Sequence, residues 1–383
     1  NLNIGGDATL GVNYNYSFSD ERNSDMRYLL NELDSMTLAN LSFAQIPSLQ
    51  LLDGVIDPEN SHRQKYRENA HIINFTARYS TGQRSLDKPG GKGFIYFYAN
   101  PKPRVLNRSL NYSMIGYDTI AVRRFVVPEV SARLNYAADT HNQTRDYFTS
   151  LSWESVPQLF SMRNLIDVFN TTDPLNIYRG NPNLKSGYRH SGSAEFTFTK
   201  RKNKYMRHGI SFRDSLYTGS VVSGTIYDPV TGVRTSSVYN VDGERGIRVS
   251  YNGGGDIVKW ENRPFKSLSY NAALTAESGR SVRMIATSTN SNADNMVRPE
   301  TTFTYSKSLN PSAGLTVRFG SDHNIGISGS GFFNHYHGED FDEFSAADYN
   351  FGINGSFSLP RSIRLSTSLK VVGHSGYADS VMN

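Results

Sequence analysis

The chain has 383 residues, a net charge of +5 and no cysteine. Its length allows two ordinary domains or one large β architecture, and the lack of cysteine excludes a disulfide scaffold, a thiolate metal site and a cysteine nucleophile. The basic residues are spread between predicted strands instead of lining one helix, which argues against nucleic-acid binding. Only 37% of the residues are apolar, yet 23 are tyrosine and 21 phenylalanine. This balance is typical of a membrane barrel, because every second strand residue faces lipid and the others face water.

The first predicted element is a strand over residues 4–18. Its length exceeds the five or six residues of a typical globular strand and suits a strand that crosses a membrane. One parity is apolar or small and the other is polar, which is a strong strand signal. The first set is Ile4, Gly6, Ala8, Leu10, Val12, Tyr14, Tyr16 and Phe18, and the second is Asp7, Thr9, Asn13, Asn15 and Ser17.

A long connection, residues 20–69, is predicted to follow this strand. Within it, Met26, Leu29, Leu30, Leu33 and Met36 have helical spacing. Asn23 or Ser24 could cap such a helix. We therefore expect one short helix in this connection.

The same alternation returns along the rest of the chain, near residues 126–136, 194–198, 268–275 and 349–371. Short connections are predicted at 200–204, 310–313 and Pro360, and long ones at 20–69, 139–146, 155–189, 228–245 and 335–348. Two sizes of connection are typical of a barrel with short turns at one rim and long loops at the other. The predicted fold is an all-β, antiparallel transmembrane β-barrel of about 14 to 16 strands, with residues 1–383 forming one outer-membrane barrel region.

A specific motif lies between the alternating stretches at 126–136 and 194–198. Asp173-Pro174-Leu175-Asn176 is followed by Gly180-Asn181-Pro182-Asn183-Leu184-Lys185. It resembles the DPxN…GNPNLKPE segment of the barrels of TonB-dependent receptors, and is most similar to the outer-membrane β-barrel family of the Bacteroidetes group. A second stretch, Tyr227-Asp228-Pro229-Val230-Thr231-Gly232 leading to Asn240-Val241-Asp242-Gly243, resembles a later loop of that family.

The resemblance implies a function and partners. It implies location in the cell outer membrane, contact with outer-membrane lipid, and uptake of a scarce, unidentified solute energised by the TonB complex. A surface lipoprotein is a further partner that it allows. Ser186-Gly187 replaces the family's Pro-Glu, and the plug domain and TonB box of such receptors are not recognisable, so we expect a fragment of the barrel. A non-transporting outer-membrane or surface β protein that binds or adheres is the alternative, and a soluble carbohydrate-binding β-sandwich comes third.

The motif loop has two interpretations. Glycine, proline and asparagine favour a tight turn that sets strand register, whereas the family resemblance also allows a role in gating or ligand contact. The candidate residues are Asp173, Pro174, Asn176, Gly180, Asn181, Pro182, Asn183, Leu184 and Lys185. Because short turns belong to the periplasmic side, the short basic turn at 200–204 predicts that this loop lies at the outer rim.

Other chemistry is weakly indicated. His335, His337 and Glu339 would share one face of a continuous strand and could bind a transition metal, but a hydrated acidic loop explains the same residues. The glycine run Asn252-Gly253-Gly254-Gly255-Asp256 lies in a segment with strand-like alternation and no following helix, which favours a bent strand or turn over a phosphate site. We expect no cofactor, no metal and no enzymatic activity.

Overall fold

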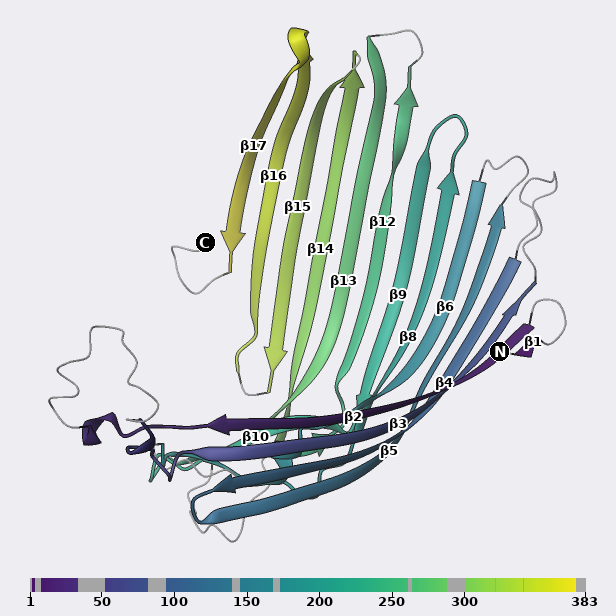
Figure 1. Cartoon of the computed structure of the whole chain (residues 1–383). Coiled ribbons are helices and arrows are strands. Elements are labelled where there is room, and N and C mark those ends of the chain that lie inside the picture. The colour runs from purple at the N-terminus through teal and green to yellow at the C-terminus, as the bar shows by residue number, and fades with distance from the viewer. Residues whose placement is uncertain are drawn as a thin grey trace.

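The computed structural model describes residues 2–3, 8–33, 52–81, 94–139, 145–167, 173–260, 264–287, 300–320, 322–339 and 341–376. Its main body is one curved antiparallel sheet (Figure 1). The first half of the wall comprises β2 (Ala8–Asp25), β3 (His62–Ser80), β4 (Phe94–Met114), β5 (Tyr117–Asp139), β6 (Arg145–Gln158) and β8 (Gly187–Lys200). The second half comprises β9 (Met206–Thr218), β12 (Arg245–Lys259), β13 (Phe265–Thr287), β14 (Glu300–Phe319), β15 (His323–Gly338), β16 (Phe344–Leu359) and β17 (Ile363–Ser375).

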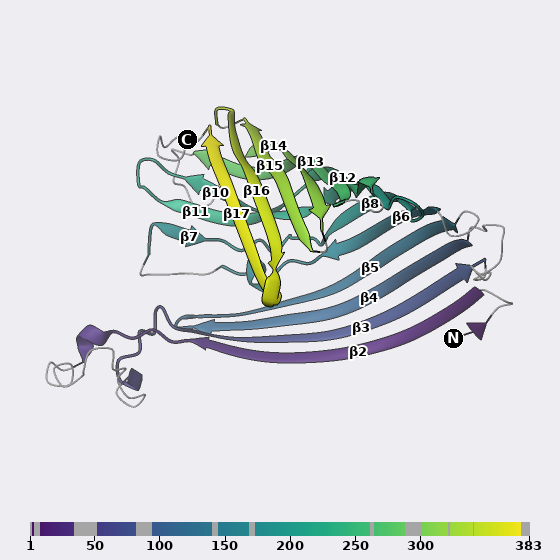
Figure 2. The ribbon, with the colours of Figure 1, turned by 90° about the horizontal axis from the view of Figure 1, so that it is seen from above.

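Each wall strand pairs antiparallel with the next in this order. The two-residue strand β1 (Leu2–Asn3) pairs with β2. No described pairing joins β2 to β17, so the sheet is open, and Figure 2 shows these strands as its two edges. The described residues form thirteen long wall strands within a sheet of 17 strands, where about 14 to 16 were expected, and the antiparallel β prediction is confirmed.

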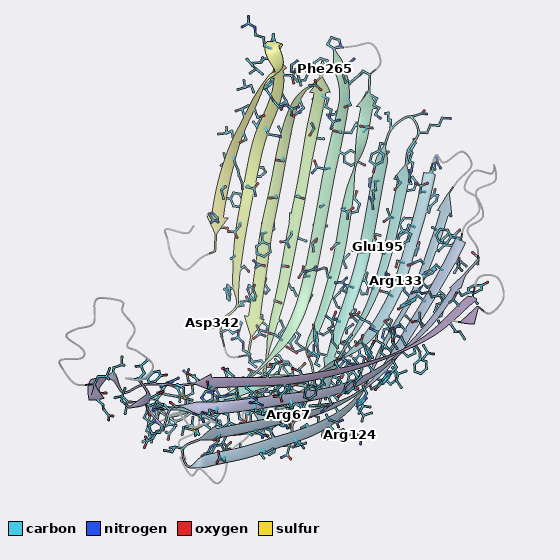
Figure 3. The ribbon with its side chains drawn as sticks, viewed as in Figure 1. Arg67, Arg124, Arg133, Glu195, Phe265 and Asp342 are labelled. Carbon is cyan, nitrogen blue, oxygen red and sulfur yellow. The ribbon has the colours of Figure 1, made fainter. Side chains whose placement is uncertain are left out.

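The connections separate into two rims. Short turns at 201–205, 320–322 and 360–362 share one rim, which we call the short-turn rim. The three longest connections, 26–61, 159–186 and 219–244, share the opposite rim, the long-loop rim, which also holds the two-residue turn Ile115–Gly116 between β4 and β5. Phe265 lies at the first rim and Asp342 at the second (Figure 3).

Several predicted boundaries were wrong. The expected turn at 310–313 lies inside β14, where Pro311 lacks an N–H and the β14–β15 ladder skips residues 310 and 311. The predicted long loop 335–348 shortens to 339–343, because β15 continues to Gly338. The connection 139–146 belongs to the short-turn rim, since Arg145 pairs with Lys200.

The predicted helix at residues 26–36 was also wrong. β2 continues through Asn23 and Ser24 to Asp25, so neither residue caps a helix. Within the described residues 26–33, the 3₁₀ turn η1 (Leu30–Glu32) is the one helical element. The apolar spacing does not form one buried face, because Leu33 is 9% exposed whereas Leu30 is 47% exposed. Met36, like residues 4–7 of the first predicted strand, lies outside the described residues.

The two faces of the sheet differ in chemistry. The predicted apolar parity of β2 is exposed on one face, as Leu10, Val12, Tyr14, Tyr16 and Phe18 all show. We call this the convex face. The opposite face, the concave face, carries hydroxyl, amide and charged side chains, with ion pairs such as Arg189–Glu154 at 2.8 Å. Apolar convex and hydrated concave surfaces are what lipid outside and water inside require.

The pattern reverses where β3, β4 and β5 reach the long-loop rim. There the concave side chains of Leu106, Leu110 and Phe125 are buried. Polar or charged residues take the convex positions of β3 and β4 there, including Arg67, whereas on β5 Arg124 lies between the exposed Val122 and Val126 (Figure 3). Because the convex side of β3 and β4 turns polar while the covered concave side is apolar, the ends of these two strands project beyond the lipid.

Prolines interrupt one ladder of the wall. The β3–β4 pairing skips residues 73–76 opposite the stretch that contains Pro101 and Pro103, whose nitrogens cannot donate. Asn100, which is 2% exposed, donates from its side chain to the carbonyl of Phe75 at 2.9 Å. An amide side chain thus satisfies a backbone acceptor that a proline leaves unpaired.

Candidate functional site: the motif loop at the long-loop rim

The connection from β6 to β8, residues 159–186, folds onto the concave face. Its apolar side chains Phe160, Met162 and Ile166 are 3–5% exposed and pack in one cluster with Leu106 and Leu110 of β4. A 3₁₀ turn, η3 (Met162–Leu165), aims them at the wall, and the Ser161 hydroxyl caps it by accepting from the Arg163 N–H at 3.3 Å. The connection is therefore anchored by a hydrophobic core of its own.

Leu184 extends this anchor into the motif. It is 5% exposed and belongs to the same buried cluster. Its neighbours Asn183 and Lys185 are exposed, and the carbonyl of Pro182 accepts a hydrogen bond from Arg123 of β5. The leucine of the motif thus fixes the loop to the wall while its neighbours remain at the surface.

Asn181 joins three segments. Its backbone N–H donates to the carbonyl of Asn164 at 2.8 Å, and its side-chain amide donates to the carbonyl of Val238 at 2.8 Å. Its side-chain oxygen accepts from the N–H of Asn183 at 2.9 Å, which forms an Asx turn. Both ends of the side-chain amide are satisfied, so asparagine suits this position better than an isosteric apolar residue.

Val238 belongs to a hairpin that the long-loop rim adds to the wall. Its strands are β10 (Ser220–Tyr227) and β11 (Arg234–Val241). β10 also pairs parallel with the end of β13, and β11 pairs parallel with β7 (Asn176–Tyr178) of the motif loop. Figure 2 shows β7, β10 and β11 on the concave side of the sheet.

Asn240 connects the two motif stretches. Its side-chain oxygen accepts from the Lys185 N–H at 2.8 Å, and its amide donates to the carbonyls of Lys185 and Gly219, each at 2.8 Å. The N–H of Gly219 in turn donates to Asp242 at 2.6 Å. Two stretches about 55 residues apart in sequence are therefore held together by side-chain amides.

Position 180 requires glycine because the backbone of another part of the loop lies very close to it. A Cβ at this position would lie 2.4 Å from the carbonyl carbon of Ile166. Its N–H donates to the carboxylate of Asp167 at 2.8 Å, and Arg179 pairs with the same carboxylate at 3.3 Å. Gly187, where the family has glutamate, is similarly crowded, since its Cβ would lie 2.5 Å from the carbonyl oxygen of Gly219.

The first part of the motif forms a turn. The Asn176 N–H donates to the Asp173 carbonyl at 3.1 Å, and the Asn176 amide donates to the Asp173 carboxylate at 2.8 Å. Pro174 lies between them in the turn. This turn starts β7 and so places the motif beside β11.

The β10–β11 turn is closed by an acidic side chain. The Asp228 carboxylate accepts from the Thr231 hydroxyl at 2.8 Å and from the Val230 N–H at 2.9 Å. The Thr231 hydroxyl, followed by the backbone N–H groups, lowers the pKa of Asp228. Gly232 has a φ of +75° in this turn, which explains the glycine of the second motif stretch.

The residues considered for metal binding make other contacts. His335 Nδ1 lies 2.9 Å from the Ser345 hydroxyl, His337 stacks on Tyr305 with ring centroids 6.1 Å apart, and Glu339 accepts from the Phe303 N–H at 3.2 Å. Within the described ranges, no group of three His, Cys, Asp or Glu side chains could hold a metal ion.

The glycine run, residues 253–255, lies in β12 and is paired with β13 on one side and β9 on the other. A Cβ on Gly253 would lie 2.7 Å from Nδ1 of His208. The ring of His208 hydrogen-bonds the hydroxyls of Tyr251 and Tyr270 at 2.8 and 2.9 Å. The run therefore makes room for an aromatic cluster on the convex face near the short-turn rim, where interface aromatics are common.

The helices of the described part of the chain are all too short or too polar to span a bilayer. The long antiparallel strands, the apolar convex face, the hydrated concave face and the unequal rims together define an integral β-barrel protein of an outer membrane. Residues 131–326 match the Outer membrane protein beta-barrel family, and the chain belongs to that family. Comparison with curated proteins and with solved structures found no match. The protein is located in the outer membrane, in contact with its lipid.

Sequence reasoning missed several residues of this site. Asn164, Asp167 and Arg123 hold the motif, yet none lies in a motif stretch. The apolar residues of 159–166 carried the available signal, because a connection exposed to water has no need of buried phenylalanine, methionine and isoleucine.

Proposed function

We propose that the chain is the barrel region of a TonB-dependent receptor of the type found in Bacteroidetes, which imports a scarce solute. The observation that carries the proposal is the docking of the two motif stretches, through Asn181, Lys185 and Asn240, on the concave face at the long-loop rim. A loop held there would narrow the mouth of a water-filled passage, where an incoming solute first meets the protein.

The concave wall below the loop supports the same proposal. Ion pairs such as Arg248–Glu277 and hydroxyl pairs such as Ser152–Ser193 line it. Such a surface can exchange hydrogen bonds with a hydrated solute. We further propose that energy comes from the TonB complex, that a surface lipoprotein is a partner, and that the chain has no enzymatic activity.

The test compares three strains in their own growth medium: wild type, a deletion of this gene, and a deletion of the TonB component. Depletion of siderophores, haem, cobalamin, oligosaccharides and peptides from the medium is followed by mass spectrometry. We expect one class to be depleted by the wild type and by neither deletion strain. Equal depletion by all three strains would instead favour a barrel with a binding or adhesion role.

A second arm addresses the loop. Asn181→Ala should lower depletion of that solute while folded barrel in the membrane stays constant, with Lys202→Ala in the short turn as the matched control. Unchanged depletion would make the motif a structural turn only.

A further inference from the structure

The convex face between β13 and β17 contains a hollow of about 780 Å³. Its floor is made by Ala272 and Ala313, which lie opposite each other, and by Gly329 on the next strand. Leu315, Phe333 and Phe351 are among the larger side chains around it. Small residues on three neighbouring strands thus create a recess, which we call the outer groove.

A second hollow of about 350 Å³ continues toward the long-loop rim, and Phe333 lines both. It is also lined by Lys307 and His335, which face each other across β14 and β15. Lys307 is exposed and has no hydrogen bond or ion pair with another described residue. An apolar recess therefore ends beside the exposed side chain of Lys307.

We propose that the outer groove binds one acyl chain of an outer-leaflet lipid and that Lys307, beside His335, binds its anionic headgroup. The site faces the membrane and is separate from the solute passage, so it does not rest on the proposed uptake function. It requires only the outer-membrane barrel and its orientation, with the long-loop rim outside.

The dimensions match one leaflet. Six residue steps separate Ala313 from Lys307, or about 20 Å along the strand. A strand tilt of about 40° reduces this to a depth of roughly 15 Å. That is half of the ~30 Å hydrocarbon core, so a chain whose headgroup contacts Lys307 ends near Ala313, in the middle of the membrane.

The charge also selects the occupant. A lysine at the membrane interface attracts anionic lipid, and its stem can lie along apolar surface while the ammonium reaches the headgroups. A zwitterionic lipid gains much less from that ammonium. The proposal therefore predicts a headgroup preference at one position on the barrel.

The test measures retained lipid on the full-length protein by native mass spectrometry after detergent exchange. The probes are dimyristoyl phosphatidylglycerol and dimyristoyl phosphatidylcholine, which share their acyl chains. Lys307→Gln should lower phosphatidylglycerol affinity about fivefold and leave phosphatidylcholine unchanged. Ala313→Trp, which fills the exposed floor, should lower the affinity for both lipids.

Arg124→Gln, on the convex face of β5, is the matched control and should change neither affinity. Folding of each variant is checked by resistance of the barrel to unfolding in sodium dodecyl sulfate. Unchanged lipid binding by folded Ala313→Trp would overturn the proposal that the outer groove binds lipid. If Ala313→Trp changed the oligomeric state and left lipid binding unchanged, the groove would instead be assigned to contact with a second copy of the chain. An equal effect of Lys307→Gln on both lipids, or none on either, would overturn the headgroup contact.

Discussion

The orientation of the wall makes a quantitative prediction at Ile353. Its side chain lies on the convex face of β16, opposite Ile327, which in turn lies opposite Leu315. The convex apolar row on β14 runs from Phe319 to Leu309, ten residue steps or about 34 Å. A tilt of about 40° gives it a height of about 26 Å, close to the ~25 Å apolar band of such barrels.

Ile353 therefore lies within one residue step, about 3 Å, of the middle of the band. Arginine at mid-bilayer on the lipid face costs about 2 to 4 kcal/mol, so Ile353→Arg should lower the free energy of folding into lipid vesicles by that amount. Its neighbour Asn354 lies on the concave face, and Asn354→Arg should change the free energy of folding by less than about 0.5 kcal/mol.

A third variant tests depth. Leu365 is also on the convex face, but it pairs with Phe357 close to the short-turn rim, where arginine costs only about 0 to 1 kcal/mol. Reversible urea titration of the folded barrel in vesicles gives all three values. Equal costs at Ile353 and Asn354 would refute the assignment of the faces, and a Leu365 cost as large as that of Ile353 would refute the position of the band.

The remaining predictions concern the motif loop. Leu184→Ala removes a side chain that is 5% exposed and should weaken docking of the loop 159–186 by about 2 to 4 kcal/mol. The weaker docking should appear as faster cleavage of the loop by an external protease, and the control variant Lys185→Ala should leave the cleavage rate unchanged. Gly180→Ala should release the loop because its Cβ would clash with Ile166, whereas Gly192→Ala, with nothing within 4 Å, should not. Burial and Arg163 lower the pKa of His62, so the unfolded state binds the proton more readily. Docking of the loop 159–186, which contains Arg163, should therefore weaken as pH falls below about 6.5. Protease cleavage of this loop should become faster over that range, and a pH-independent cleavage rate would contradict the prediction.

Much of the fold could be predicted from alternation alone. The parity of β2, β5, β13, β16 and β17 is visible in the sequence because lipid and water impose opposite demands on successive residues. β4 was not visible, because Pro101 and Pro103 normally exclude a residue from a paired strand. Its place depends on Asn100, whose side chain satisfies an acceptor on β3, and local sequence does not show such a contact.

The strand ends were predicted less well for a physical reason. Near the long-loop rim, concave positions of β4 and β5 also become apolar, so Phe125 and Val127 are buried while Val126 between them is exposed on the convex face. A reading based on one continuous alternation fails at that boundary. The cover that buries these residues comes from residues 159–186, a connection that sequence alone treats as an exposed loop.

The candidate site was likewise predictable from the sequence only in part. The motif residues were predictable as a turn, since glycine, asparagine and proline each have a local reason to be there. Their partners Val238 and Asn240 lie more than 50 residues away. Only the arrangement of strands brings the two stretches together, and the resemblance of both to one family was the only sequence signal that associated them.

The most direct test of the account is the sidedness of the motif loop. The chain has no cysteine, so single cysteines can be placed at Asn183, exposed in the motif loop, and at Lys202, exposed in the short β8–β9 turn. Lys202 is chosen because the next residue, Asn203, has a φ of 69°, a left-handed backbone conformation that favours asparagine over cysteine. On intact cells a membrane-impermeant maleimide should label the cysteine at 183 and not the one at 202, which should react only after the outer membrane is opened. The reverse pattern would contradict the assignment of the long-loop rim to the cell exterior.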